Sequence, residues 1–207
     1  MNKVKIKFCG LTRKTDITFV NALLPDYIGF MFAPKSRRYI SPQTAVSLKK
    51  ELAPSILAVG VFQNEPIEHI LALLKNGTID MAQLHGLENK DYIHELKRQT
   101  KKPVLKAFSI QDKKDLLLAE TSPADYILLD NGSGGTGIRF DWNLLHDFQR
   151  PYFLAGGLNE QNIPKALEIL SPFAVDLSSG IETNGVKDFN KMQAIMNQIK
   201  AIKEIKQ

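Results

Sequence analysis

The chain of 207 residues is poor in cysteine, with Cys9 as its only thiol. A single cysteine forms no intramolecular disulfide, so nothing points to an oxidising compartment. No apolar run approaches the roughly 20 residues of a membrane-spanning helix. The first residues are basic and then alternate, which predicts no signal peptide. These absences together predict a cytoplasmic protein that does not enter a membrane.

Long linkers, low-complexity segments and internal sequence repeats are also missing from the sequence. The one stretch rich in glycine and serine, residues 131–139, falls inside a predicted strand–helix unit rather than between two domains. A chain of this length buries roughly 70% of its unfolded surface, so it needs no disulfide or metal to fold. We therefore predict one domain over residues 1–207.

The charge pattern argues against nucleic acid as a partner. The net charge is +5 and the pI is about 9.2, but the lysines are scattered rather than gathered in one patch or motif. A positive field of this kind favours an anionic small substrate. One cysteine and four scattered histidines have no metal-ligand spacing, so we predict no metal site.

Eight short apolar runs rich in Val, Ile, Leu and Phe predict strands. They cover residues 5–9, 27–32, 56–62, 79–85, 103–108, 125–130, 151–156 and 173–179. Most are too apolar for a sheet with one wet face, which indicates parallel strands covered by helices. Segments with helical spacing lie between them, at 16–24, 41–52, 64–77, 89–100, 110–121, 159–170 and 188–205, with a weaker one at 142–148.

Local signals predict where several helices begin and end. Thr15, Ser41 and Asn64 are predicted N-caps, Pro42 suits a first helical position, and Gly77 suits a C-terminal end. The β-α alternation leaves two architectures open, an open doubly wound sheet and a closed barrel. Eight units in about 200 residues favour a single-domain (β/α)₈ TIM barrel, in which the active site lies at the C-terminal ends of the strands.

Two glycine-containing motifs stand at the ends of the seventh and eighth predicted strands. They are "AGGL", with Gly156 and Gly157, and "SSGIE", with Ser179 and Gly180. Loops at these positions commonly build a phosphate site in this fold, although a pair of glycines also suits a tight turn. The glycine-rich stretch "NGSGGTG" after the sixth strand predicts a loop that closes on a ligand, with a merely flexible loop as the alternative.

Cys9 and Asp130 end the first and sixth predicted strands. A free cysteine is most often an apolar filler, but strand alternation places Cys9 on one face with Lys5 and Lys7, and a nearby ammonium lowers a thiol pKa. A partly desolvated Asp130 suits general acid work, with a structural cap as the alternative. Together they predict a thiolate base and a carboxylic acid on opposite walls of the barrel.

Two further polar positions stand at the predicted mouth. Arg38 follows the second strand beside Arg37, and an arginine can bind a carboxylate through two hydrogen bonds. Gln83 and His85 end the fourth strand. For His85 a structural or contact role is favoured over a base, because the sequence reveals no acid–base partner for it.

The ordered set "KFCGLT", "GFMFAPKSRRYIS", "VGVFQNE", "AQLHG", "ILLDN", "GGTGIRFDW", "AGGLN" and "FAVDLSSGIE" resembles the phosphoribosylanthranilate isomerases of tryptophan synthesis. The matching stretches run from Lys7 to Glu182. The resemblance implies the (β/α)₈ barrel and an Amadori rearrangement of N-(5-phosphoribosyl)anthranilate to 1-(2-carboxyphenylamino)-1-deoxyribulose 5-phosphate. It also implies that no cofactor or metal takes part. A monomer and a homodimer are both compatible with it.

The resemblance also implies roles for individual residues. Cys9 is the expected general base, Asp130 the expected general acid and Arg38 the expected ligand of the anthranilate carboxylate. The remaining expected contacts are with phosphate, at Gly156, Gly157, Ser179 and Gly180, and with the rest of the substrate, at Gln83, His85, Gly135, Thr136, Gly137 and Asp176.

The chain departs from the family pattern at two places. It has "KFCG" where "KICG" is more usual, which exchanges one apolar residue for another. It has "AGGL" where "SGGL" is common, which removes a hydroxyl from the expected phosphate site. The alternatives are a related phosphosugar barrel, such as a histidine-pathway isomerase or indoleglycerol-phosphate synthase, and a phosphate-binding barrel without catalysis.

Overall fold

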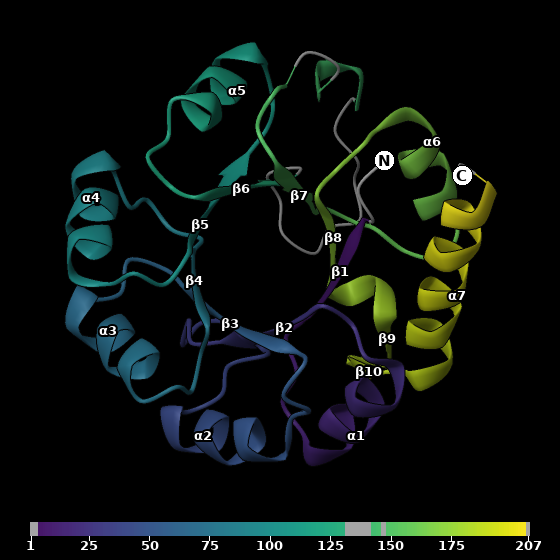
Figure 1. The fold of residues 1–207 in the computed structure, drawn as a ribbon, viewed down its shortest axis with the longest axis horizontal. Coiled ribbons are helices and arrows are strands. Elements are labelled where there is room, and N and C mark those ends of the chain that lie inside the picture. The colour runs from purple at the N-terminus through teal and green to yellow at the C-terminus, as the bar shows by residue number, and fades with distance from the viewer. Residues whose placement is uncertain (1–3, 131–141, 146–147, 206–207) are drawn as a thin grey trace.

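The computed structural model describes residues 4–130, 142–145 and 148–205, and its centre is a ring of eight parallel strands. Each strand pairs with the next, and the last pairs with the first in the register Lys7 to Asp176, so the sheet is closed (Figure 1). The barrel prediction is therefore confirmed over the open sheet. The strands are β1 Lys5–Cys9, β2 Tyr27–Met31, β3 Leu57–Phe62, β4 Met81–Leu84, β5 Val104–Ser109, β6 Tyr126–Asp130, β7 Tyr152–Leu154 and β8 Ala174–Leu177.

Helices surround this ring on the outside (Figure 1). In the described part of the chain they are α1 Lys14–Leu23, α2 Pro42–Glu51, α3 Ile67–Lys75, α4 Lys90–Gln99, α5 Lys113–Glu120, α6 Ile163–Ile169 and α7 Phe189–Ile205. The weak helix predicted between β6 and β7 is instead the short 3-10 helix η1, Trp142–Leu145. None of the helices in the described ranges is both long and apolar enough to cross a membrane.

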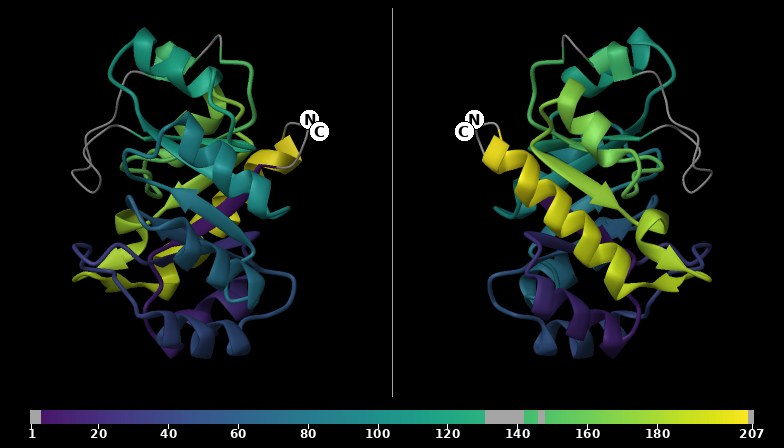
Figure 2. Two further views of the ribbon diagram at one scale, coloured as in Figure 1. Left: turned by 90° about the vertical axis from the view of Figure 1, so that its left-hand side faces the viewer. Right: turned by 90° about the vertical axis from the view of Figure 1, so that its right-hand side faces the viewer.

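A short insertion separates β8 from the last helix. It consists of the 3-10 helix η2, Ser179–Ile181, and a two-stranded antiparallel hairpin, β9 Glu182–Thr183 and β10 Val186–Lys187. Figure 2 shows this hairpin at the same end of the barrel as the loop after β2. That end carries the C-terminal ends of the parallel strands.

Two apolar layers hold the barrel together. The larger lies between strands and helices and contains Ile6 and Phe8 of β1. The smaller fills the barrel interior and includes Tyr27 and Phe153, whose ring centroids are 5.5 Å apart. Because side chains alternate along a strand, Lys7 and Cys9 face the interior when Ile6 and Phe8 face the helices.

The predicted N-cap is correct for one helix and wrong for two others. Ser41 caps α2 by accepting a hydrogen bond from the Thr44 amide, as predicted. The Thr15 cap is wrong, because α1 already begins at Lys14 and the Asp16 carboxylate accepts the amides of residues 12 and 13 instead. The Asn64 cap is also wrong, since its side chain bonds the Leu87 amide in the next βα loop.

Candidate active site

A pocket of about 290 Å³ opens at the C-terminal ends of the strands. It brings together most of the residues predicted from the sequence: Cys9, Arg38, Gln83, His85, Asp130, Gly156, Gly157, Asp176 and Ser179. Gly180 lies just behind this wall, in η2. Gly135, Thr136 and Gly137 lie outside the described residues. Closure of the barrel therefore brings side chains from distant parts of the sequence into one cavity.

Cys9 is a buried free thiol at the last position of β1. Burial raises its pKa, and the nearby ammonium groups of Lys7 and Lys187 oppose this without overcoming it. The expected lowering effect of a nearby ammonium is present, but the net pKa of the thiol is raised, because desolvation outweighs the lysines. Deprotonation of Cys9 depends on these two cations, since both stabilise a thiolate.

Below the thiol lies a buried polar group in the centre of the barrel. The Lys7 ammonium donates to Asp176 Oδ2 at 2.8 Å and to Gln83 Oε1 at 2.9 Å. Burial acts to lower the pKa of Lys7, but Asp176 and Cys9 together outweigh it. The net pKa of Lys7 is therefore raised, and the side chain stays charged. Asp176 Oδ1 is buried and has no hydrogen-bond partner among the described residues. Since Asp176 lines the pocket, this oxygen can accept a hydrogen bond from a substrate hydroxyl.

Asp130 faces His85 across the pocket. His85 Nε2 and Asp130 Oδ2 are 3.8 Å apart, which is beyond hydrogen-bond distance. Burial lowers the pKa of His85, although Asp130 acts to raise it, so the imidazole is neutral near pH 7. The sequence did not reveal this neighbour, because the two residues lie 45 positions apart and meet only through closure of the barrel. A neutral His85 suits a substrate contact.

The structure distinguishes the two adjacent arginines. The Arg38 side chain is 16% exposed and lines the pocket, whereas Arg37 is 62% exposed and lies outside the lining. Both contact Glu182, the first residue of β9, whose carboxylate is also bound by Lys187. Sequence reasoning missed Glu182 and Lys187. The only signal was an acidic residue that ends the motif "SSGIE" at the barrel rim.

The loops after β7 and β8 form the side of the pocket expected to bind phosphate. Gly156 and Gly157 both have positive φ, 89° and 66°, a conformation that other residues rarely adopt. Gly180 packs so closely on the carbonyl of Leu158 that a Cβ would overlap it, which joins the two loops. A wall that contains glycines lets an anion approach the backbone closely, which suits a phosphate.

No group of three or more histidine, cysteine or acidic side chains able to hold a metal occurs within residues 4–130, 142–145 and 148–205. The charged or ionisable groups that line the pocket include one thiol, the two carboxylates of Asp130 and Asp176, and the cations of Lys35 and Arg38. Such an arrangement supplies proton transfer and anion binding from side chains alone.

Comparison with known proteins identifies the family of the chain. A family model described as N-(5'phosphoribosyl)anthranilate (PRA) isomerase matches residues 6–198. The chain belongs to this family. The N-(5'-phosphoribosyl)anthranilate isomerase of Endomicrobium trichonymphae is 50% identical over 192 residues, which cover 91% of this chain and 94% of that protein. That of Thermoanaerobacter sp. is 44% identical over 97% of this chain and all of its own length.

Solved structures of phosphoribosylanthranilate isomerases agree with the fold. The enzyme from Thermus thermophilus superposes with a TM-score of 0.87 at 32% identity, covering 96% of this chain and all of that chain. A second structure, in complex with reduced 1-(o-carboxyphenylamino)-1-deoxyribulose 5-phosphate, has a TM-score of 0.82 at 35% identity and covers 96% of this chain and 99% of its own. The family resemblance seen in the sequence is thus confirmed, while the roles of single residues stay predictions.

Proposed function

We propose that this isomerase converts N-(5'-phosphoribosyl)anthranilate to 1-(2-carboxyphenylamino)-1-deoxyribulose 5-phosphate, with Asp130 as general acid and Cys9 as general base. The observation that supports this most strongly is the position of the two groups. They end β1 and β6 and line the same pocket, which Arg38 and the glycines after β7 also line. A substrate with a carboxylate at one end and a phosphate at the other fits between these two anion-binding regions.

The proton transfers follow from this placement. Asp130 donates a proton to the furanose ring oxygen, the C1–O bond breaks, and the nitrogen lone pair forms a protonated Schiff base. The Cys9 thiolate then removes the proton from C2, and the electron pair of the C–H bond moves to form the enolamine. Proton return to C1 and loss of the hydroxyl proton from C2 give the ketone, so atoms and charge balance without a cofactor.

The other pocket residues bind and orient in this proposal. Arg38 binds the anthranilate carboxylate, and the backbone amides around Gly156, Gly157 and Ser179 bind the phosphate. Asp176 accepts a hydrogen bond from a ribose hydroxyl through Oδ1, which has no partner in the described part of the chain. A solved relative holds a reduced, phosphorylated product analogue, which supports a substrate of the same class for this chain.

The test is turnover of freshly prepared substrate by the wild-type protein and by Cys9→Ala and Asp130→Asn variants. Each variant is expected to lose about 10²- to 10⁴-fold in kcat, as on removal of a general acid or base. Asp125→Asn is a matched control at the other end of β6, where it bonds Lys97 and lies outside the pocket. Wild-type rates in both active-site variants would overturn the assignment, and a folded wild-type protein that binds phosphate without turnover would favour a non-catalytic barrel.

A further inference from the structure

We propose that Glu182 is a positioning residue that fixes the Arg38 guanidinium toward the pocket, and so determines selectivity for a substrate that carries a carboxylate. Lys187 in turn holds Glu182. This inference rests on the proposed function and deepens it, because it concerns how the carboxylate end of the substrate is recognised.

The two side chains form a two-point contact. Arg38 Nε donates to Glu182 Oε1 at 2.6 Å, and Arg38 Nη2 donates to Oε2 at 2.8 Å. A guanidinium has five N–H donors in one plane, and this contact occupies one edge of it. The other N–H donors of the Arg38 guanidinium have no protein partner within the described ranges. The edge that includes Nη1 is therefore available for a second carboxylate.

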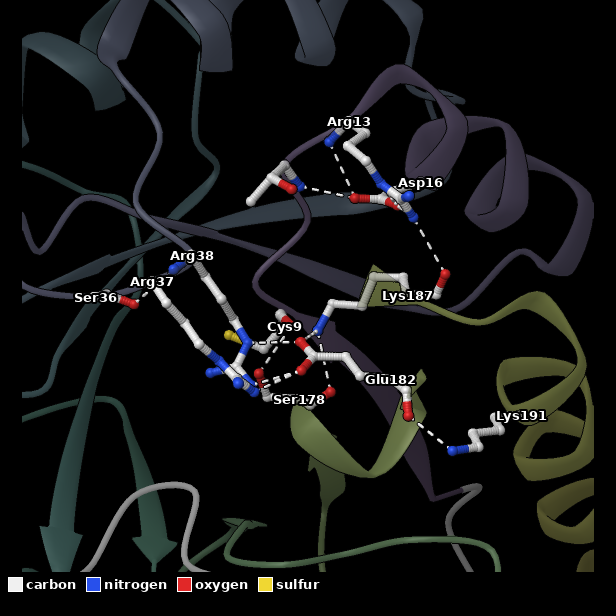
Figure 3. Close-up of polar contacts among 11 residues, drawn as sticks. Cys9, Arg13, Asp16, Ser36, Arg37, Arg38, Ser178, Glu182, Lys187 and Lys191 are labelled. Carbon is white, nitrogen blue, oxygen red and sulfur yellow. Dashed lines mark hydrogen bonds and ion pairs between the residues drawn. The ribbon is translucent and has the colours of Figure 1, made fainter. Parts of the chain in front are cut away.

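Lys187 in turn fixes the position of Glu182. Its side chain is buried, and Lys187 Nζ donates to Oε1 at 2.7 Å and to the carbonyl of Ser178 at 3.0 Å (Figure 3). Glu182 and Lys187 also face one another in the register of the β9–β10 hairpin. Burial acts to raise the pKa of Glu182, but Arg38 and Lys187 together outweigh it. The net pKa of Glu182 is therefore lowered, and the carboxylate stays ionised. The Glu182 side chain, whose carboxylate is bound by Arg38 and Lys187, therefore has little rotational freedom.

The backbone beside the thiol completes the arrangement. Gly10 has a φ of 79°, and a Cβ there would overlap Cδ of Arg38. The stem of Arg38 therefore lies directly against the residue that follows Cys9. Ser178 Oγ donates to the carbonyl of Cys9 at 3.2 Å, so the hairpin side of the cluster also contacts the base (Figure 3).

The charges of the cluster favour an anion. Arg37, Arg38 and Lys187 all contact the single carboxylate of Glu182, which leaves an excess of positive charge next to the pocket. If Glu182 only neutralised these cations, its removal would strengthen anion binding. If it orients Arg38, its removal weakens binding of a carboxylate, because the two-point geometry toward the ligand is lost.

The experiment compares two ligands by calorimetry. The first is reduced 1-(o-carboxyphenylamino)-1-deoxyribulose 5-phosphate, and the second is the same compound without the carboxylate. Glu182→Gln, of nearly the same size, is expected to weaken binding of the first by about 10- to 100-fold and of the second by less than about twofold. In turnover the variant should raise KM with a much smaller change in kcat, which a general loss of structure would not produce.

Three further variants complete the design. Val186→Thr, an exposed position on the same hairpin, is the matched control and should leave both ligands unaffected. Glu182→Asp keeps the charge and is expected to retain part of the selectivity, and it supplies the measurement if Glu182→Gln does not fold. Arg38→Lys should abolish selectivity by itself, so a selective Arg38→Lys protein would refute the role of Arg38 in the proposed function.

The proposal on Glu182 fails separately if Arg38→Lys loses selectivity while Glu182→Gln keeps it. It also fails if Glu182→Gln weakens both ligands equally, since Glu182 would then support only the loop. Stronger binding of the carboxylate ligand in Glu182→Gln would show that Glu182 only neutralises the neighbouring cations.

Discussion

Lys7→Met removes the ammonium from the centre of the barrel while keeping a side chain of similar length. Lys7 is fully buried, with 0% of its side chain exposed, and Asp176 is 9% exposed. Because methionine occupies about the same volume, the change leaves no large cavity. It does leave Asp176 Oδ2 without its partner, and Oδ1 already has none among the described residues.

The magnitude follows from this unpaired charge. Removal of one partner of a buried ion pair costs about 3–5 kcal/mol in the free energy of unfolding. For a protein of about 200 residues, each kcal/mol lowers Tm by roughly 2–4 °C. The variant is therefore expected to melt roughly 6–20 °C below the wild type. Urea unfolding followed by circular dichroism measures the free energy directly.

Lys14→Met is the matched control for this variant. Lys14 forms an ion pair with Glu51 at 2.7 Å, nearly the same distance as the Lys7–Asp176 pair at 2.8 Å, but the two side chains are 75% and 45% exposed. Water solvates the remaining carboxylate there, so the control should unfold like the wild type. The double variant Lys7→Met/Asp176→Asn carries no charge at either of these two positions and should recover part of the stability. A Lys7→Met protein as stable as Lys14→Met would refute the reasoning.

Two other predictions concern the thiol. Burial raises the Cys9 pKa, and in the proposed mechanism the Cys9 thiolate is the base. The value of kcat/KM, which reports the free enzyme, should therefore rise about tenfold per pH unit from neutral pH through the ordinary thiol range near 8.5. A plateau below pH 7 would show a lowered pKa instead. In Gly29→Ala the new methyl group would lie 2.5 Å from Cys9 Sγ, so the thiol must move, and kcat should fall by about 10- to 100-fold at unchanged circular dichroism. Gly60→Ala, whose methyl group would meet Ile79 and Phe62 in the interior of the protein, should lower Tm without this loss of kcat, and equal kcat values in the two variants would contradict the displacement of Cys9.

The apolar pattern of the sequence predicted most strand ends to within one or two residues. The predicted strand 27–32 is β2 Tyr27–Met31, and 151–156 is β7 Tyr152–Leu154. The ends differ because pairing with neighbouring strands, rather than apolar composition, decides where a strand stops. The cap at residue 64 was wrong because Asn64 bonds the Leu87 amide in the loop before α4, a contact that exists only in the folded protein. The cap at residue 15 was wrong for a local reason, because the adjacent Asp16 accepts the backbone amides instead.

The sequence by itself determined the barrel, the edge at which chemistry takes place and most of the residues on that edge. Eight apolar runs with helical segments between them specify these features, because in parallel βα units every strand ends at the same side. Cys9 and Asp130 were identified in this way, as the last residues of their strands.

Only the tertiary structure decided what surrounds those residues. The neutral His85 beside Asp130 and the Glu182 that binds Arg38 come from positions 45 and 144 residues away from their partners. The net direction of the Cys9 pKa also depends on burial, which no local pattern reveals, because desolvation there exceeds the effect of two lysines. Spacing along the chain specifies which side chains reach the rim, whereas their charges and partners are set by distances that exist only after the barrel closes.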